Sequence, residues 1–199
     1  GVMLTHSNFI AQLDDASDRI TVQPGDKVIC VLPVWHAFQR ACEYVSLCQG
    51  GALCYSKPIG SILLADMQAL NPQLMPAVPR VFEAVYDGVM RTMRKTGGIV
   101  YSLFRFFTNV ALIQSKLGRK MFRREARFKK DSILLTWIVC FIPWLIVTPL
   151  KALGGKLVFS KIRSKLGNRF VGGVSGGGAL PPAIDEFFWA VGVNVVEGY

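Results

Sequence analysis

The chain has 199 residues, of which 51% are hydrophobic, and a formal net charge of +10. Its mean hydropathy of +0.36 is high for a freely soluble domain, and its length allows one sizeable core. The cysteines show neither a CxxC motif nor Cys/His metal spacing: they are Cys30, Cys42, Cys48, Cys54 and Cys140. We therefore expect reduced thiols in a cytosolic setting and no metal site within this chain.

The first half of the chain alternates between patterns typical of helices and of strands. Pro24–Asp26 is a turn signal, Ser7, Asn8 and Ser61 are placed to cap helices, and Pro79 favours a first helical position. In chain order we expect a helix over 5–20, a strand over 27–32, a helix over 37–49, a strand over 51–55, a helix over 61–70, a strand over 73–78 and a helix over 79–95.

A strongly basic arm follows, between Arg91 and Lys130, with twelve Lys/Arg against one acidic residue, Glu125. Within the arm, Phe106, Val110, Ile113, Leu117 and Met121 recur at helical spacing and form an apolar stripe. A basic amphipathic helix fits an anionic membrane surface; a solvated helix face packed on its own domain is the alternative. Nucleic acid is not the expected partner, because no nucleic-acid-binding motif accompanies the charge. The expected membrane contacts are Arg119, Lys120, Arg123, Arg124, Trp137 and Trp144.

Nineteen residues without a charge, Ser132 to Leu150, come directly after the arm. A helix needs about twenty apolar residues to cross a bilayer, basic residues flank both ends, and Pro143 should interrupt the helix midway. We therefore favour an interfacial or re-entrant hairpin over a buried core or subunit-contact helix and over a true span. A subunit-contact helix would allow a homo-oligomer, which the sequence leaves open.

The chain ends as it began, with alternating elements. Gly154-Gly155 punctuates the chain, and we then expect a helix over 156–166, a strand over 169–175, a helix over 182–191 and a strand over 193–196. Strands alternating with helices indicate an α/β fold with parallel strands covered by helices. We divide the chain into an α/β part at 1–95, a helical insertion at 96–155 and a second α/β part at 156–199.

Three consecutive glycines, Gly176 to Gly178, follow the strand that ends at Ser175. Glycines without a Cβ let a flat ligand lie against the main chain, and ligands bind at the carboxyl ends of parallel strands. Tyr199, at the end of the last strand, could cover the ligand's other face. A glycine-rich surface turn is the alternative.

Four ordered motifs resemble the AMP-forming adenylating superfamily, and more narrowly the long-chain fatty acyl-CoA synthetases, over essentially the whole chain. They are Gly1–Asn8, Leu32-Pro-Val-Trp-His36, Val78-Pro-Arg-Val-Phe-Glu83 and Ser175–Leu180. The resemblance implies a fragment of the family's large N-terminal domain, with the phosphate-binding loop before Gly1 and Gly-x-Thr-Glu after Tyr199. We therefore expect this segment to be inactive alone.

The resemblance also implies an activity: ATP activates a long-chain fatty acid to an acyl-adenylate, and coenzyme A then takes the acyl group, with Mg²⁺ on the phosphates. It assigns His36 a catalytic position, and Trp35, His36 and Arg80 the acyl and coenzyme A pocket. His36 capping a helix and Arg80 in a surface ion pair are the alternatives. The implied adenine site comprises Ser175, Gly176, Gly177, Gly178, Ala179, Glu197, Gly198 and Tyr199.

Two other functions remain open from the sequence. One is a membrane-anchored interaction protein whose α/β part is structural, and the other is an adenylating ligase for a different carboxylic acid. For the enzyme we expect a cytoplasmic location with peripheral or monotopic membrane association.

Overall fold

The computed structural model describes residues 2–17, 20–124 and 132–198. The described chain separates into two compact units. The sheet unit comprises residues 1–85, 164–181 and 194–199, and the helical unit comprises residues 86–163 and 182–193. The three-part division predicted from the sequence cuts the chain differently and stays a prediction.

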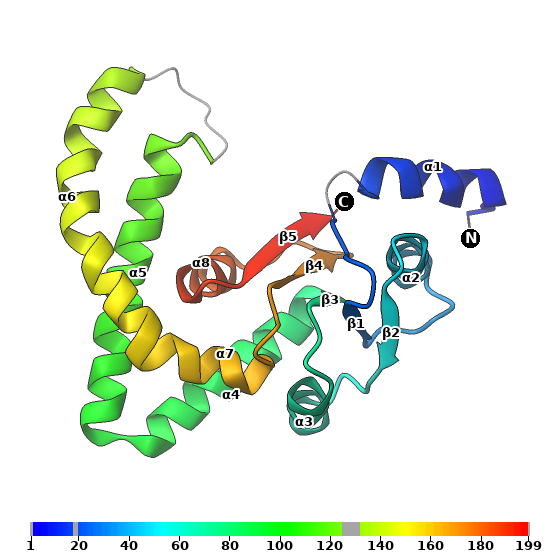
Figure 1. Ribbon diagram of the computed structural model, residues 1–199, viewed down its shortest axis with the longest axis horizontal. Helices are drawn as coiled ribbons and strands as arrows, with labels where there is room; N and C mark the ends of the chain where they lie inside the picture. The colour runs from blue at the N-terminus through cyan, green and yellow to red at the C-terminus, as the bar shows by residue number, and fades with distance from the viewer. Residues whose placement is uncertain (1, 18–19, 125–131, 199) are drawn as a thin grey trace. The chain divides into compact units, whose positions relative to one another are not determined.

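The sheet unit is built on a parallel sheet whose described strands have the order β2-β1-β3-β4-β5 (Figure 1). Its strands are β1 (Lys27–Cys30), β2 (Ala52–Tyr55), β3 (Leu74–Ala77), β4 (Gly172–Gly176) and β5 (Asn194–Gly198). Its helices are α1 (His6–Ser17), α2 (Ala37–Cys48) and α3 (Gly60–Leu70). The predicted α/β class with parallel strands is therefore confirmed.

The core of the sheet unit contains apolar strand residues that a parallel sheet hides on both faces. Val28 and Ile29 of β1 and Ala77 of β3 have no exposed surface, and neither has Phe82, near the start of α4 (Pro79–Thr96). Helix α2 packs against β1, β2 and β3, and α1 packs against α2. This arrangement leaves the carboxyl ends of β4 and β5 next to the α1–α2 pair.

The helical unit contains an antiparallel pair formed by α5 (Gly98–Met121) and α6 (Ile133–Gly154) (Figure 1). After α6 the chain continues through η1 (Gly155–Phe159) into α7 (Ser160–Leu166), and α8 (Pro182–Val191) packs against α5. The buried face of α5 includes Phe104, Phe107, Ala111 and Ser115, and Phe187 of α8 lies edge-on to Tyr86, with 4.8 Å between ring centroids.

Three local predictions are wrong. Helix α6 runs through Pro143 instead of stopping there, because Pro143 is exposed and α5 supports the helix on both sides of it. Gly154 lies inside a continuous helix, where it gives Phe107 room: a Cβ on Gly154 would come within 2.7 Å of that ring. Ser61 is not a cap, since α3 begins at Gly60 and Ile59 occupies the N-cap position without a side-chain hydrogen bond.

The apolar stripe predicted on α5 is only partly buried. Val110 and Met121 are buried, whereas Phe106 and Ile113 are 52% and 50% exposed. Two partners, α6 and α8, pack against α5 and together set which positions are covered.

Candidate functional site

The glycine turn after β4 has room for a ligand at only part of its length. A Cβ on Gly176 would lie 2.7 Å from the ring of Phe38, so that glycine is already covered by a side chain of α2. Gly177 has φ +79°, a left-handed conformation that favours glycine. Side chains added at Gly177 and Gly178 would meet only Val78 at 3.7 Å and Pro79 at 3.8 Å. The open backbone is therefore that of Gly177 and Gly178.

The end of β5 lies beside this turn because the two strands are parallel neighbours. In the register of the pair, Ser175 is opposite Glu197 and Gly176 is opposite Gly198. The structure thus brings together two segments that the sequence placed at separate strand ends. Tyr199, the predicted stacking residue, lies outside the described residues.

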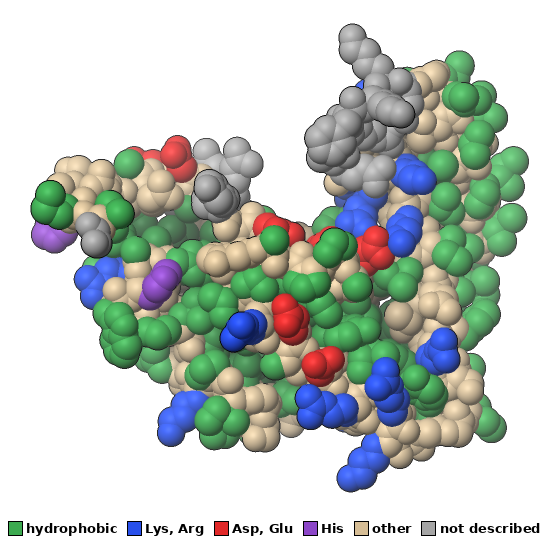
Figure 2. Space-filling view, turned by 180° about the vertical axis from the view of Figure 1, so that it is seen from behind, with side chains coloured by type: hydrophobic (Ala, Val, Ile, Leu, Met, Phe, Trp, Pro, Cys, Tyr) green, Lys and Arg blue, Asp and Glu red, His purple; other side chains and the backbone are tan. Residues whose placement is uncertain are grey.

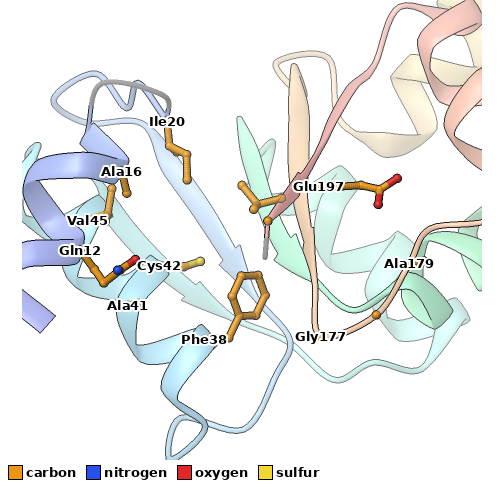
Figure 3. A pocket seen from close by; sticks show the side chains of 13 residues that line it. Gln12, Ala16, Ile20, Phe38, Ala41, Cys42, Val45, Gly177, Ala179 and Glu197 are labelled. Atoms are coloured by element: carbon orange, nitrogen blue, oxygen red, sulfur yellow. The ribbon is translucent and has the colours of Figure 1, made fainter. Parts of the chain in front are cut away.

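A cavity of about 780 Å³ opens at this edge of the sheet (Figure 3). One side is formed by the backbone of residues 177–179 with Glu197 and Gly198. The opposite side is formed mainly by apolar side chains of α1 and α2. The described residues lining it are Gln12, Ala16, Ile20, Phe38, Ala41, Cys42, Val45, Val174, Gly177, Gly178, Ala179, Glu197 and Gly198.

The electrostatics of the cavity are simple. Glu197 is the charged residue among the described lining side chains. The thiol of Cys42 also borders the cavity, and burial, with smaller contributions from Cys30 and Glu43, raises its pKa to about 12. A thiol with that pKa is protonated at neutral pH and is a poor nucleophile, so Cys42 forms part of the wall.

The predicted acyl and coenzyme A residues are not among the residues that line this cavity. His36 is the N-cap of α2, where its Nδ1 accepts a hydrogen bond from the Phe38 N–H at 3.2 Å. Trp35 is 80% exposed, and Arg80 is exposed at the second position of α4. The capping alternative is thus realised for His36, and the catalytic role stays a prediction.

Ser175 also differs from the rest of the predicted adenine site. It is fully buried in β4 and does not line the cavity. Its Oγ has no hydrogen-bond partner among the described residues. Of the predicted adenine site, Gly177, Gly178, Ala179, Glu197 and Gly198 line the cavity, whereas Ser175 and Gly176 do not; the ligand contacts stay a prediction.

The sequence analysis missed the α2 wall. Phe38, Ala41, Cys42 and Val45 face the cavity, and their spacing of three and four residues is that of one helix face. This periodicity was visible in the sequence. What the sequence lacked was the information that this face points toward the end of β4.

The predicted membrane residues fall into two groups. Arg119 is only 18% exposed and forms an ion pair with Asp185 of α8 at 3.1 Å, so it packs on its own unit. Lys120, Arg123 and Arg124 are exposed. Trp137 and Trp144 pack against Phe122, with ring centroids 5.5 Å and 6.2 Å away.

No metal site is formed by the described residues. Within residues 2–17, 20–124 and 132–198, no cluster of three or more His, Cys, Asp or Glu side chains could hold a metal ion.

The continuous helix Ile133–Leu166 has the length and the apolar composition that a membrane crossing requires. Its most apolar stretch has a mean hydropathy of 2.2.

Known proteins resemble this chain over its whole length. The chain is 35% identical over 209 residues to probable acyl-activating enzyme 16, chloroplastic, of Arabidopsis thaliana. It is 33% identical to the Arabidopsis long-chain-fatty-acid–[acyl-carrier-protein] ligase AEE15, chloroplastic, and 29% identical to long-chain-fatty-acid–CoA ligase 5 of Rattus norvegicus. All of the chain is covered, but only 28%, 28% and 26% of these proteins.

The fold has a solved counterpart in the N-terminal domain of FACL13 from Mycobacterium tuberculosis. The TM-score is 0.56 at 14% identity, with all of this chain and 33% of that chain covered. The family pattern described as "AMP-binding enzyme" matches residues 1–199. The chain belongs to the AMP-binding enzyme family.

Proposed function

We propose that the protein containing this chain activates a long-chain fatty acid with ATP and transfers the acyl group to the thiol of coenzyme A. The observation that carries this proposal is the cavity at the ends of β4 and β5, in which open glycine backbone faces an apolar helix wall. The family match and the fatty-acid ligases among the relatives support it. Since the chain spans 28% or less of those relatives, the activity is proposed for the whole protein.

The reaction has two displacements. A carboxylate oxygen of the fatty acid attacks the α-phosphorus of ATP, an O–P bond forms, and pyrophosphate leaves. The thiol sulfur, after losing its proton, then attacks the carbonyl carbon, and AMP leaves with the electron pair of the broken C–O bond. Both steps depend on holding the reacting atoms in line.

The bare backbone of Gly177 and Gly178 suits the flat face of adenine. Gly177 and Gly178 carry no Cβ, and the nearest atoms that an added Cβ would meet are 3.7–3.8 Å away, so a planar ring can approach the main chain closely. Glu197 and Gly198 border the same space and can contact the edge of the ring or the ribose. Tyr199 remains the proposed stacking residue.

The apolar wall suits an acyl chain. Phe38, Cys42 and Val45 of α2 and Ala16 and Ile20 provide a surface on which methylene groups are removed from water, and each buried CH₂ contributes about 0.8 kcal/mol. This wall favours a long acyl chain over a short one, and so favours a fatty acid among the carboxylic acids that the sequence left open.

Mg²⁺ would neutralise charge on the phosphates of ATP. The described residues offer no carboxylate cluster for a protein-bound ion, so we assign no step of the reaction to a metal site in this segment.

An acyl carrier protein is a second candidate for the thiol acceptor. A relative at 33% identity bears that activity in its name, whereas the named coenzyme A ligase cited above is 29% identical. The two acceptors are distinguished by supplying the full-length protein with coenzyme A or with acyl carrier protein after adenylate formation and measuring which thioester accumulates.

We propose a cytoplasmic location because the cysteines are free thiols, and free thiols persist in reducing compartments. They are Cys30, Cys42, Cys48, Cys54 and Cys140. Relatives named as chloroplastic and peroxisomal make cell fractionation the deciding measurement.

The nucleotide assignment is tested with Gly178→Val in the full-length protein. Gly178 does not have the positive φ that favours glycine, and the space around it is open. The variant protein should therefore fold normally, with the valine side chain in the place of the adenine ring. We expect the KM for ATP in pyrophosphate release with hexadecanoate to rise about tenfold or more, the loss of roughly 1.4 kcal/mol of binding. Gly177 is unsuitable, because φ +79° would strain any side chain.

Gly60→Val is the matched control, since Gly60 also has open space around it but lies at the start of α3, away from the cavity residues. An unchanged KM for ATP in Gly178→Val would refute the adenine assignment. A full-length protein that releases no pyrophosphate with any fatty acid would instead favour the interaction-protein alternative.

A further inference from the structure

Helix α6 is apolar on all sides. It has no charged residue from position 132 to position 150, and 6% of its most apolar window is buried. A helix that is hydrophobic all round belongs in a protein core or in a lipid environment. One side of α6 has a protein partner and the other does not, so the two faces require separate accounts.

The inner face of α6 packs against α5. Trp144 contacts the position of Gly118, where an added Cβ would lie 3.3 Å from the indole Nε1. Lys151 donates to Gln114 Oε1 at 2.9 Å and to Ser115 Oγ at 3.4 Å. These contacts run in antiparallel register along both helices, and on α6 they include Trp144, Thr148 and Lys151.

The outer face of α6 consists of aliphatic side chains that are 52–69% exposed: Ile133, Leu134, Leu135, Ile138, Val139, Ile142, Leu145 and Ile146. Figure 2 shows hydrophobic side chains along this free edge of the helical pair. A contiguous apolar surface of this kind marks an interaction site.

Basic side chains lie at one end of this face. Lys120, Arg123 and Arg124 are exposed at the C-terminal end of α5, and the antiparallel register, with Phe122 stacked edge-on to Trp137, places that end beside the start of α6. The guanidinium of Arg124 lies 5.8 Å from the centre of the Phe122 ring, which orients it at this end.

We propose that the outer face of α6 inserts into the surface of an anionic lipid bilayer, with Lys120, Arg123 and Arg124 against the acidic head groups. A bilayer supplies both an apolar phase and negative charge, and each basic group near the surface adds to binding. A second copy of the same face would supply only the apolar surface.

The helix lies in the interface and does not cross the bilayer. A crossing would carry α5 into the hydrocarbon, because α5 packs along α6. Lys116 and Arg119 of α5 form ion pairs with Glu186 and Asp185, and charged groups are costly at the bilayer centre. Trp137 and Trp144 then support the face from behind, and the aliphatic outer face makes the lipid contact that the sequence assigned to the tryptophans.

The test is flotation of the full-length protein with vesicles of phosphatidylglycerol and phosphatidylcholine, compared with vesicles of phosphatidylcholine alone. The first variant removes apolar contact by combining Ile138→Ser, Ile142→Ser and Ile146→Ser. Its control carries three such changes at exposed positions of the sheet unit, Leu47→Ser, Ile62→Ser and Val171→Ser. The second variant, Arg123→Glu with Arg124→Glu, reverses charge; Lys57→Glu with Lys165→Glu makes the same charge change at other exposed positions.

We expect the wild type to float with the anionic vesicles. The isoleucine variant and the charge-reversal variant should each lose about tenfold or more of this binding, whereas the two controls should bind as the wild type does. High salt should weaken binding in part, and alkaline carbonate should extract the protein. Resistance to carbonate would overturn the interfacial placement. Three results would each overturn the lipid assignment. The isoleucine variant could bind vesicles as well as the wild type, or the wild type could form a lipid-free dimer that the isoleucine variant dissociates. The wild type could also fail to bind vesicles while the isoleucine variant has a lowered unfolding temperature.

Discussion

The sheet unit and the helical unit place their apolar side chains differently. In the sheet unit, the residues of β1 and β3 are hidden by neighbouring strands and helices, and a cavity opens where glycines follow β4. In the helical unit, α6 hides one face against α5 and exposes the other. The comparison shows that similar hydrophobicity in sequence has two outcomes: in one unit it builds a core beside a cavity, and in the other it builds an exposed surface.

The largest effect should separate buried from exposed apolar residues. Phe82→Ala in the sheet unit removes a ring with no exposed surface, and we expect it to lower the free energy of unfolding by about 3–5 kcal/mol. Ile142→Ala in α6, where the side chain is 64% exposed, should lower it by less than about 0.5 kcal/mol. Urea unfolding of the full-length protein measures both, and equal losses would mean that α6 is covered by another part of the protein.

Much of the alternation of strands and helices could be predicted from the sequence because its signals are local. Pro79 and Pro182 begin α4 and α8 at the positions expected, since proline fits the first helical turn. Short apolar runs bounded by turns gave each strand to within a few residues. The glycine turn and Glu197 were expected to lie together, and the structure places them side by side, because carboxyl ends of parallel strands share an edge of the sheet; their contact with a ligand stays a prediction.

The missing parts depended on distant partners. Pro143 and Gly154 are breaking signals only for an isolated helix; contact with α5 keeps α6 continuous, and Phe107 fills the space that Gly154 leaves. The apolar wall of the cavity was missed because the direction in which α2 faces is set by the sheet. Likewise, nothing local to Arg119 shows that it will meet the carboxylate of Asp185.

An intermediate effect should follow from the ion pairs within the helical unit. Arg119→Gln breaks the contact with Asp185 in a half-buried setting, where the arginine is 18% exposed, and we expect a loss of about 1–2 kcal/mol of unfolding free energy. Lys116→Gln breaks the pair with Glu186, but Lys116 is 55% exposed, so its loss should stay below about 0.5 kcal/mol. Similar losses for both variants would mean that Arg119 does not hold α5 to α8.

The smallest effect is a difference in alkylation rate between two thiols of the unchanged protein. Cys48 is exposed on α2, whereas Cys42, six residues earlier on the same helix, borders the cavity. Burial raises the pKa of Cys42 to about 12, so only about one molecule in ten thousand carries its thiolate at pH 8. Iodoacetamide followed by mass spectrometry should therefore modify Cys48 well before Cys42.

The same shift fixes the direction of a pH effect on stability. Burial also raises the pKa of Cys30 to about 12, from an ordinary value of 9.0. Between pH 9 and pH 12 the folded protein therefore holds protons at Cys30 and Cys42 that the unfolded chain releases, and stability falls as the pH rises through that range. Replacing both residues with alanine should flatten this decline, while Cys48→Ala leaves it in place. Rapid alkylation of Cys42 at pH 8 would show that its thiol is open to solvent, and that the apolar wall separating the cavity from the core of the sheet unit is looser than its packing indicates.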